Sequence, residues 1–234
     1  MSNTMLIAKN ITKHYKTTPA LHDVCISVPK GQIHGLLGPN GSGKSTFLKI
    51  TSGILTYDEG RLTLDGQPFS SKTKSQVAFL PENNHLYEWM TVKDAVGFYK
   101  TFYDDFDEEH YKVLSADLKL EDDRKVTELA KGIRQQFCLC LILARKVKLY
   151  LLDEPLNGID LLARERVISM IRKTTAPDNS IIITSHLINE IEILLDTVTF
   201  IRAGKVLLEG DCEQLRFEKQ RSMADIYKEV MVRE

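Results

Sequence analysis

The chain has 234 residues, of which 43% are hydrophobic and 27% are charged, a balance that is ordinary for a folded globular protein. This length suits one large domain, or a core with a subdomain. Its 31 basic and 32 acidic side chains give a formal net charge of -1, so the strongly basic face of a nucleic-acid-binding protein is not expected. The cysteines do not form a paired framework, and we expect small buried side chains in a reducing compartment. They are Cys25, Cys138, Cys140 and Cys212.

The sequence contains no stretch suited to crossing a membrane. A transmembrane helix needs roughly 20 apolar residues, and the longest apolar run here is "FCLCLILA" at residues 137–144. Residues 1–16 lack the long apolar segment of a signal peptide. If the protein works at a membrane, another chain must therefore span it.

The first third of the chain reads as short strands separated by turns. Residues 5–11 and 21–28 alternate apolar and polar side chains, which predicts half-buried antiparallel strands. Residues 33–37 are a continuous apolar run, typical of a fully buried strand. Further strands are predicted at residues 61–69, which end in an Asp-Gly turn, and at residues 75–82, where a proline stops the strand.

The middle of the chain is helical, and buried strands return after it. Helical spacing marks residues 91–103, 107–120 and 132–146. Residues 149–152 and 180–185 are apolar strands, each followed by a helical segment. This alternation is typical of a parallel sheet with crossover helices.

The tail carries a hairpin at residues 197–210 and a short amphipathic helix at residues 223–232. The whole pattern predicts an α/β fold in a single domain, residues 1–234. We expect residues 85–145 to form a helical subdomain inserted in the α/β core, and residues 211–234 to form a short C-terminal helical tail.

A phosphate-binding loop is the strongest functional signal. "GPNGSGKST" lies between an apolar strand and a helical segment and matches G-x-x-x-x-G-K-[ST]. In such a loop, backbone N–H groups converge on phosphate oxygens, the lysine reaches the β- and γ-phosphates and the hydroxyl binds Mg²⁺. An accidental glycine-rich turn is the alternative, and the strand-to-helix context argues against it. Lys44 is also expected to act in catalysis and Ser45 to bind the metal. The expected nucleotide-binding residues are Gly38, Pro39, Asn40, Gly41, Ser42, Gly43, Lys44, Ser45 and Thr46.

A pair of acids at a strand end forms the second half of the predicted site. The apolar residues 149–152 run directly into Asp153 and Glu154. Adjacent buried carboxylates are costly unless they meet a metal, and parallel sheets bind ligands at this end of their strands. We expect Asp153 to hold Mg²⁺ through water and Glu154 to take the proton from an attacking water. A solvated loop is the alternative.

His186 follows the strand at residues 180–185 in the same strand-end position. A lone histidine is more often a helix cap or a core residue. Its place after a third buried strand argues that it faces the same crevice, where it would donate to the γ-phosphate.

With these motifs in their order, the chain resembles the nucleotide-binding subunit of ATP-binding cassette (ABC) transporters over nearly its whole length. In that family's terms, Walker A covers residues 38–46, Walker B covers residues 149–153, Glu154 is the catalytic glutamate and His186 the switch histidine. The resemblance implies a P-loop NTPase core, a mostly parallel sheet with flanking helices, joined to an N-terminal antiparallel β subdomain and an inserted α-helical subdomain. It also implies ATP and Mg²⁺ as cofactors.

Two further site residues are implied by the resemblance alone. "LNGID" resembles the family's D-loop and ends at Asp160, which is implied to contact nucleotide. Tyr15 matches the aromatic residue that stacks on adenine, although by itself it would be only a surface tyrosine.

The segment "LAKGIRQQ", residues 129–136, aligns with the family's L-S-G-G-Q signature at the start of a helix. In this family two subunits associate head to tail, and the signature of one contacts the ATP of the other. The implied contacts are Ala130, Lys131 and Gly132, where a glycine permits close approach and a helix N-terminus offers free N–H groups. Ala130 replaces the family's serine, which removes a hydrogen bond of about 1.5–3 kcal/mol to a charged group. We expect a weaker composite site, still active.

Glu82 is the second departure from the family pattern, because the Q-loop usually has glutamine at this position. A carboxylate can still bind the metal, but it would repel an unmasked γ-phosphate. We expect Glu82 to act in catalysis and in metal binding.

The implied function is ATP hydrolysis that drives conformational changes of a transporter. The residues at both departures, Ala130 and Glu82, are those of subunits that resemble export systems for peptides, drugs or lipids. The implied partners are a second ABC ATPase subunit, identical or different, and a separate integral membrane subunit, with no nucleic acid. The protein would then be cytoplasmic and peripheral on the cytoplasmic face of the membrane. Beside Glu82, the apolar residues Leu86, Tyr87, Trp89 and Met90 predict a groove for a coupling helix of the membrane partner. Ordinary subdomain core is the alternative.

Two other functions are compatible with the motifs. A soluble cassette ATPase could act on ribosomes or DNA, but such relatives usually carry two cassettes or a long coiled coil, and this chain has one Walker A. A regulatory subunit could bind ATP without hydrolysing it, but the presence of Glu154 and His186 speaks against that reading.

Overall fold

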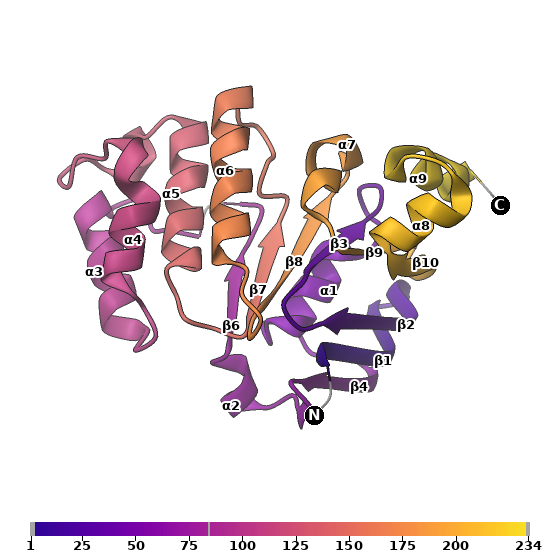
Figure 1. Cartoon of the computed structure of the whole chain (residues 1–234). Coiled ribbons are helices and arrows are strands. Elements are labelled where there is room, and N and C mark those ends of the chain that lie inside the picture. Colours follow the sequence, from indigo (N-terminus) through magenta and orange to yellow (C-terminus); the bar gives the residue numbers. More distant parts are fainter. Residues whose placement is uncertain (1–2, 84, 233–234) are drawn as a thin grey trace.

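The smaller of two sheets is built from the N-terminal part of the chain (Figure 1). The computed structural model describes residues 3–83 and 85–232. Within them, this sheet has the order β2-β1-β4-β5 and is antiparallel throughout. Its strands are β1 Thr4–Tyr15, β2 Thr18–Pro29, β4 Glu59–Leu64 and β5 Gln67–Pro68.

The larger sheet has the order β10-β9-β3-β8-β7-β6 and is parallel except for β10, which pairs antiparallel with β9 at one edge. Every residue of β3, β7 and β8 is buried, which explains their continuous apolar runs. The strands are β3 Ile33–Leu37, β6 Val77–Leu80, β7 Leu149–Asp153, β8 Ser180–Ser185, β9 Thr197–Arg202 and β10 Lys205–Asp211.

The helices surround the larger sheet, with α3, α4 and α5 at the left of Figure 1 and α8 and α9 beside β9 and β10 at the right. The α-helices are α1 Lys44–Thr51, α2 Ser71–Lys74, α3 Val92–Phe102, α4 Glu108–Ser115, α5 Lys131–Leu143, α6 Leu161–Thr174, α7 Ile188–Ile191, α8 Cys212–Lys219 and α9 Met223–Val232. Short 3-10 helices lie at Ala116–Leu118, Val126–Glu128 and Glu192–Leu194. Within the described residues, no helix is long and apolar enough to cross a membrane.

The predicted α/β class, with an antiparallel N-terminal sheet and a helical region, is confirmed by this architecture. The strand predicted at residues 61–69 is in fact the pair β4 and β5, because the chain turns back at Asp65 and Gly66, both with positive φ. The helix predicted at residues 107–120 ends early, since Lys119 takes a left-handed φ of 48° after a 3-10 turn. The expectation of buried cysteines is wrong for Cys25, which is exposed on β2.

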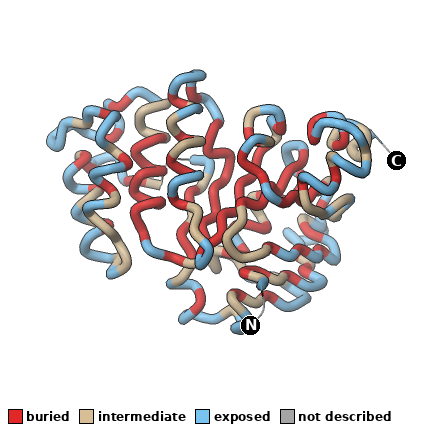
Figure 2. Tube along the Cα trace, viewed as in Figure 1, coloured by how far each residue is buried: buried red, intermediate tan, exposed pale blue. Residues whose placement is uncertain are grey.

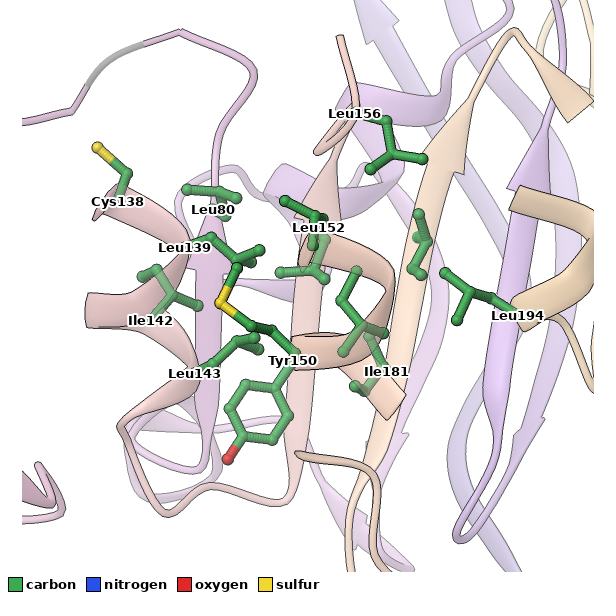
Figure 3. Packing of buried hydrophobic residues seen from close by; sticks show 14 of the residues in the cluster. Leu80, Cys138, Leu139, Ile142, Leu143, Tyr150, Leu152, Leu156, Ile181 and Leu194 are labelled. Carbon is green, nitrogen blue, oxygen red and sulfur yellow. The ribbon is translucent and has the colours of Figure 1, made fainter. Parts of the chain in front are cut away.

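One large hydrophobic core joins the helical region to the central sheet. Leu139 and Leu143 of α5 lie against Tyr150 and Leu152 of β7 in this core (Figure 3). A second core fills the space between the smaller sheet and the other face of the larger one, around α1. Buried residues accordingly follow the central strands and the inner faces of α5 and α6 (Figure 2). The sheet is thereby held rigidly at the point where the site residues emerge.

Candidate functional site

The glycine-rich segment forms a tight loop between β3 and α1. Gly43 is the N-cap of α1 and has a φ of 105°, a conformation that residues with a Cβ rarely adopt. Gly38 lies so close to β9 that a Cβ there would be 2.1 Å from the carbonyl oxygen of Ile201. Both positions therefore require glycine, and the loop leads into the N-terminus of α1, where free N–H groups bind anions.

A cavity of about 440 Å³ opens over this loop. It brings together the loop, an aromatic residue and two acids that are far apart in the sequence. Gly38 and Pro39 do not line it; their carbonyl oxygens instead accept from Lys44. The lining residues are Tyr15, Thr18, Pro19, Ala20, Asn40, Gly41, Ser42, Gly43, Lys44, Ser45, Thr46, Glu82 and Glu154.

Lys44 is buried with its ammonium held at the mouth of the loop. Its Nζ donates to the carbonyl oxygens of Gly38 at 2.7 Å and Pro39 at 3.2 Å, and it lies 3.7 Å from Oε1 of Glu154. Burial lowers the pKa of Lys44, while the carboxylates of Glu154 and Asp153 act in the opposite direction. Phosphate oxygens can replace these carbonyl partners because they are also hydrogen-bond acceptors.

The predicted acid pair emerges from the end of β7, and a threonine on β8 orders it. Asp153 ends the strand and is buried, and its Oδ1 accepts a hydrogen bond of 2.6 Å from Thr184. The same hydroxyl oxygen accepts from the backbone N–H of Glu154 at 3.0 Å. Sequence reasoning missed Thr184. The signal was available, because Thr184 lies two residues before His186 at the end of the neighbouring parallel strand.

Glu154 has a φ of 51°, a left-handed conformation that is uncommon outside glycine and is often found at functional sites. The turn directs its buried carboxylate toward the crevice, where Oε2 lies 3.0 Å from Nδ1 of His186. The histidine therefore contacts Glu154, as its strand-end position suggested, but it does not line the cavity itself. A carboxylate placed between a histidine and a lysine can accept a proton from a bound water.

Tyr15 and Glu82 also reach the cavity. Tyr15 is the last residue of β1, is half exposed and lines the cavity together with Thr18, Pro19 and Ala20. Glu82 follows β6, and its Oε1 accepts a hydrogen bond of 3.3 Å from Nδ2 of Asn157. Asn157 was not among the predicted residues, although it lies within the segment "LNGID" that resembles the D-loop.

The signature and the D-loop aspartate do not join this cavity. Ala130 is the N-cap of α5 and offers no side-chain cap, and Lys131 and Gly132 form the first turn of that helix. Asp160 caps α6, where its Oδ1 accepts from the N–H of Ala163 at 2.9 Å. These hydrogen bonds hold the pKa of Asp160 below its usual value, with the Ala163 N–H the largest cause. None of the four lines the cavity of its own chain.

The residues predicted to bind metal fit Mg²⁺ that arrives with a phosphate ligand. Ser45 and Glu82 line the cavity, and Asp153 adds a buried carboxylate beside it. Hydroxyl and carboxylate oxygens are the donors that Mg²⁺ prefers, completed by waters and substrate phosphates. No cluster of at least three His, Cys, Asp or Glu side chains able to hold a metal occurs within the described ranges.

The family model described as ABC transporter matches residues 21–157, more than half of the chain. The chain belongs to the ABC transporter family. It is an ATP-binding subunit of this family, which binds ATP with Mg²⁺ and hydrolyses it to drive transport.

Curated relatives cover nearly the whole chain. ABC transporter ATP-binding protein YtrB of Bacillus subtilis is 32% identical over 92% of this chain and 74% of its own length. Lantibiotic transport ATP-binding protein SrtF of Streptococcus pyogenes is 29% identical over 93% of this chain and all of its own. Petrobactin import ATP-binding protein YclP of Bacillus subtilis is 27% identical over 90% of this chain and 88% of its own.

Solved structures share the fold. An ATP-binding subunit of an ABC transporter superposes with a TM-score of 0.87 at 24% identity, covering 97% of this chain and 99% of that one. A nucleotide-free ATP-binding cassette gives a TM-score of 0.79 at 24% identity, covering 99% of this chain and all of that one.

Proposed function

We propose that this ABC subunit works as half of a head-to-tail pair that closes on two Mg·ATP and thereby moves a separate membrane subunit. One observation carries the proposal. The signature residues Ala130 to Gly132 lie at an exposed helix start outside the cavity that contains the chain's own phosphate loop. A helix N-terminus that binds phosphate therefore needs the phosphate of another subunit. The second subunit is an identical chain or a related one.

In and beside the nucleotide cavity, each residue has a distinct task. The phosphate loop and Lys44 bind and orient the phosphates, and Tyr15 stacks on the base. Ser45, Glu82 and Asp153 are the oxygen ligands for Mg²⁺, which supplies charge neutralisation at the phosphates. Glu154 takes the proton of the attacking water, and His186, hydrogen-bonded to Glu154, keeps that carboxylate oriented and donates toward the γ-phosphate.

The face beside the D-loop is suited to meeting a second subunit. Asp160 is exposed and is followed by Leu161 and Leu162, with exposed fractions of 66% and 68%. Adjacent exposed leucines are favourable to bury in an interface. Asp160, Ala130, Lys131 and Gly132 act at this interface in the proposed pair.

A groove between the core and the helical region is the proposed docking site for the membrane subunit. It encloses about 1040 Å³ and takes its walls from β6, α3, α5 and the segment after α5. The sequence prediction for its lining is wrong, because Leu86 and Met90 are buried core residues and none of the four predicted residues lines it. Tyr87 and Trp89 are exposed and stack on each other, with ring centroids 6.0 Å apart. They follow His85 by two and four residues in the chain, and His85 does line the groove.

Export, from the cytoplasmic face of the membrane, is the direction we propose. Two of the relatives, lantibiotic transport protein SrtF and linearmycin resistance protein LnrL of Bacillus subtilis, have names associated with antimicrobial compounds. A third, YclP, is named for import, so export rests on the first two and on Ala130 and Glu82. Names of transporter subunits among the relatives also favour this function over action on ribosomes or DNA.

The head-to-tail pair is tested with Glu154→Gln. This variant should keep ATP binding, lose turnover by at least about a hundredfold, and form a dimer that depends on Mg·ATP in light scattering. The matched control adds Gly132→Glu, since a Cβ at Gly132 meets only ordinary contacts with Ile159 and the chain can still fold. It should bind ATP as a monomer. Normal turnover in Glu154→Gln, or a dimer that survives Gly132→Glu, would contradict the proposal.

A further inference from the structure

The carboxylate of Glu82 is held from outside the nucleotide cavity. Glu82 lines that cavity, whereas Asn157, whose amide donates to its Oε1 at 3.3 Å, does not. Asn157 lies in the segment that connects β7 to α6, between Glu154 and Asp160. The contact therefore joins the end of β6 to the segment that follows the two acids of β7.

The backbone around Asn157 sets the direction of its side chain. Its N–H donates to the carbonyl oxygen of Glu154 at 3.1 Å. The next residue, Gly158, has a φ of 74° and lies under the side chain of Lys131, since a Cβ there would be 2.7 Å from Nζ of the lysine. Any side chain at this glycine would meet both the strained backbone and the lysine. The backbone hydrogen bond of Asn157 and the positive φ of Gly158 define the turn that presents the Asn157 side chain.

The charge of Glu82 acts on the phosphate-binding lysine. The carboxylates near Lys44 that oppose the lowering of its pKa by burial include Glu82, after Glu154 and Asp153. A γ-phosphate bound at Lys44 would meet the same carboxylate, and like charges in a partly enclosed site repel. A carboxylate has about four lone-pair positions, so one amide can screen it and still leave positions for a metal.

We propose that Asn157 is a positioning residue for Glu82: its amide holds the carboxylate to one side and screens its charge, so that ATP can bind before Mg²⁺ neutralises the phosphates. This inference rests on the proposed role of Glu82 at the phosphates. The charge on Glu82 matters most when no metal is present. The effect of replacing Asn157 must therefore be largest on ATP binding without Mg²⁺ and smaller on the binding of Mg·ATP.

The test is ATP binding by calorimetry with a chelator and, separately, with excess Mg²⁺. Asn157→Ala should weaken metal-free ATP binding about three- to tenfold, which corresponds to about 0.7–1.4 kcal/mol of binding free energy. Asn157→Asp, of the same shape, should weaken it more, because a second carboxylate then lies against Glu82. Both losses should shrink when Mg²⁺ is added.

The matched background is Glu82→Gln, which removes the charge and keeps the shape. In it, Asn157→Ala should change metal-free binding by less than about twofold, the double-mutant-cycle sign that the two residues act together. The double variant Glu82→Gln with Asn157→Asp exchanges the two groups, so that position 82 carries the amide and position 157 the carboxylate. It should recover metal-free ATP binding. Both residues are exposed, so thermal unfolding should move little in every variant.

Two outcomes would overturn the inference. Equal losses from Asn157→Ala in the native and Glu82→Gln backgrounds would show that Asn157 does not act through the carboxylate of Glu82. No change in metal-free binding on Glu82→Gln would show that Glu82 does not meet the phosphates. Neither outcome affects the dimer formed by Glu154→Gln. The positioning role of Asn157 and the head-to-tail pair can therefore be disproved independently of each other.

Discussion

The hydroxyl of Thr184 donates to Asp153 at 2.6 Å across the parallel pair of β7 and β8. Its oxygen also accepts from the N–H of Glu154 at 3.0 Å. One side chain on β8 therefore fixes both acids at the end of β7, including the residue with the left-handed backbone. The two acids are therefore ordered by the end of the neighbouring strand as well as by their own strand.

Thr184→Val should damage both the site and the fold. It leaves a buried carboxylate oxygen and a buried N–H without this partner, a loss of about 1–3 kcal/mol in the free energy of unfolding. Turnover should fall at least about tenfold, because Glu154 is no longer held in place. Urea unfolding and steady-state ATPase measure the two effects. Thr184→Ser keeps the hydroxyl and is the control; if it behaves like the valine variant, the hydrogen bonds are not the cause.

Ala130→Ser should raise the ATPase rate of the subunit pair. In the proposed head-to-tail pair, a serine hydroxyl at the start of α5 would add a donor toward the γ-phosphate of the other subunit, a bond of about 1.5–3 kcal/mol when its partner is charged. Part of that energy is lost in ordering the side chain, so we expect a rise of a few-fold to about tenfold. Ala130→Val adds bulk without a donor and should not raise the rate. An unchanged rate in Ala130→Ser would mean that the backbone donors suffice, or that a different partner chain supplies the hydroxyl.

Trp89→Ala should uncouple ATP hydrolysis from transport. Trp89 is 65% exposed, stacks on Tyr87 and lines neither the groove nor the nucleotide cavity. The isolated subunit should therefore keep its basal ATPase, while co-purification with the membrane subunit from detergent extracts falls. Phe217→Ala, which removes another exposed aromatic ring on α8, is the control and should change neither. Loss of basal ATPase in Trp89→Ala would count against a docking role.

His34 should make the fold sensitive to acid. Its ring is buried on β3 between the hydroxyls of Thr197 and Thr199, at 2.9 and 3.0 Å, and burial lowers its pKa to about 3. In the unfolded chain a histidine binds a proton below about pH 6.5. Between these values the unfolded state holds the extra proton, so the free energy of unfolding falls as the pH falls, by up to about 1.4 kcal/mol per unit. Burial of His85, whose pKa is lowered to about 4, adds a contribution of the same sign.

Urea unfolding at several values between about pH 4 and pH 7 measures this dependence. His34→Gln removes the titrating ring, and its free energy of unfolding should vary less steeply with pH than that of the native chain. His22→Gln, at an exposed position on β2, should leave the slope unchanged. An equal slope in native chain and His34→Gln would show that other groups control the acid sensitivity.

Most of the fold could be predicted because its signals are local. The buried strands β3, β7 and β8 are continuous apolar runs, and helices α3 and α5 carry clear apolar spacing. The failures were also local in origin. The four-residue helix α2 is too short to show a period, and the Asp-Gly turn between β4 and β5 was assigned to the end of a single strand.

The sequence by itself determined the chemistry of this protein: a phosphate loop with its lysine and serine, two acids at a strand end, and a histidine at the next. These groups can be recognised in the sequence because each motif is a short run of neighbouring residues, flanked by a strand or helix that the sequence pattern also predicts. Only the tertiary structure decided which of these groups meet. Parallel pairing of β7 and β8 places Thr184 beside Asp153, and the left-handed turn at Glu154 directs its carboxylate to His186. It also set Asn157 against Glu82 and separated the signature from its own cavity. Such contacts join residues far apart in the chain. Strand-end positions pointed to Thr184 and His186, but the atoms that meet depend on how the strands and loops pack.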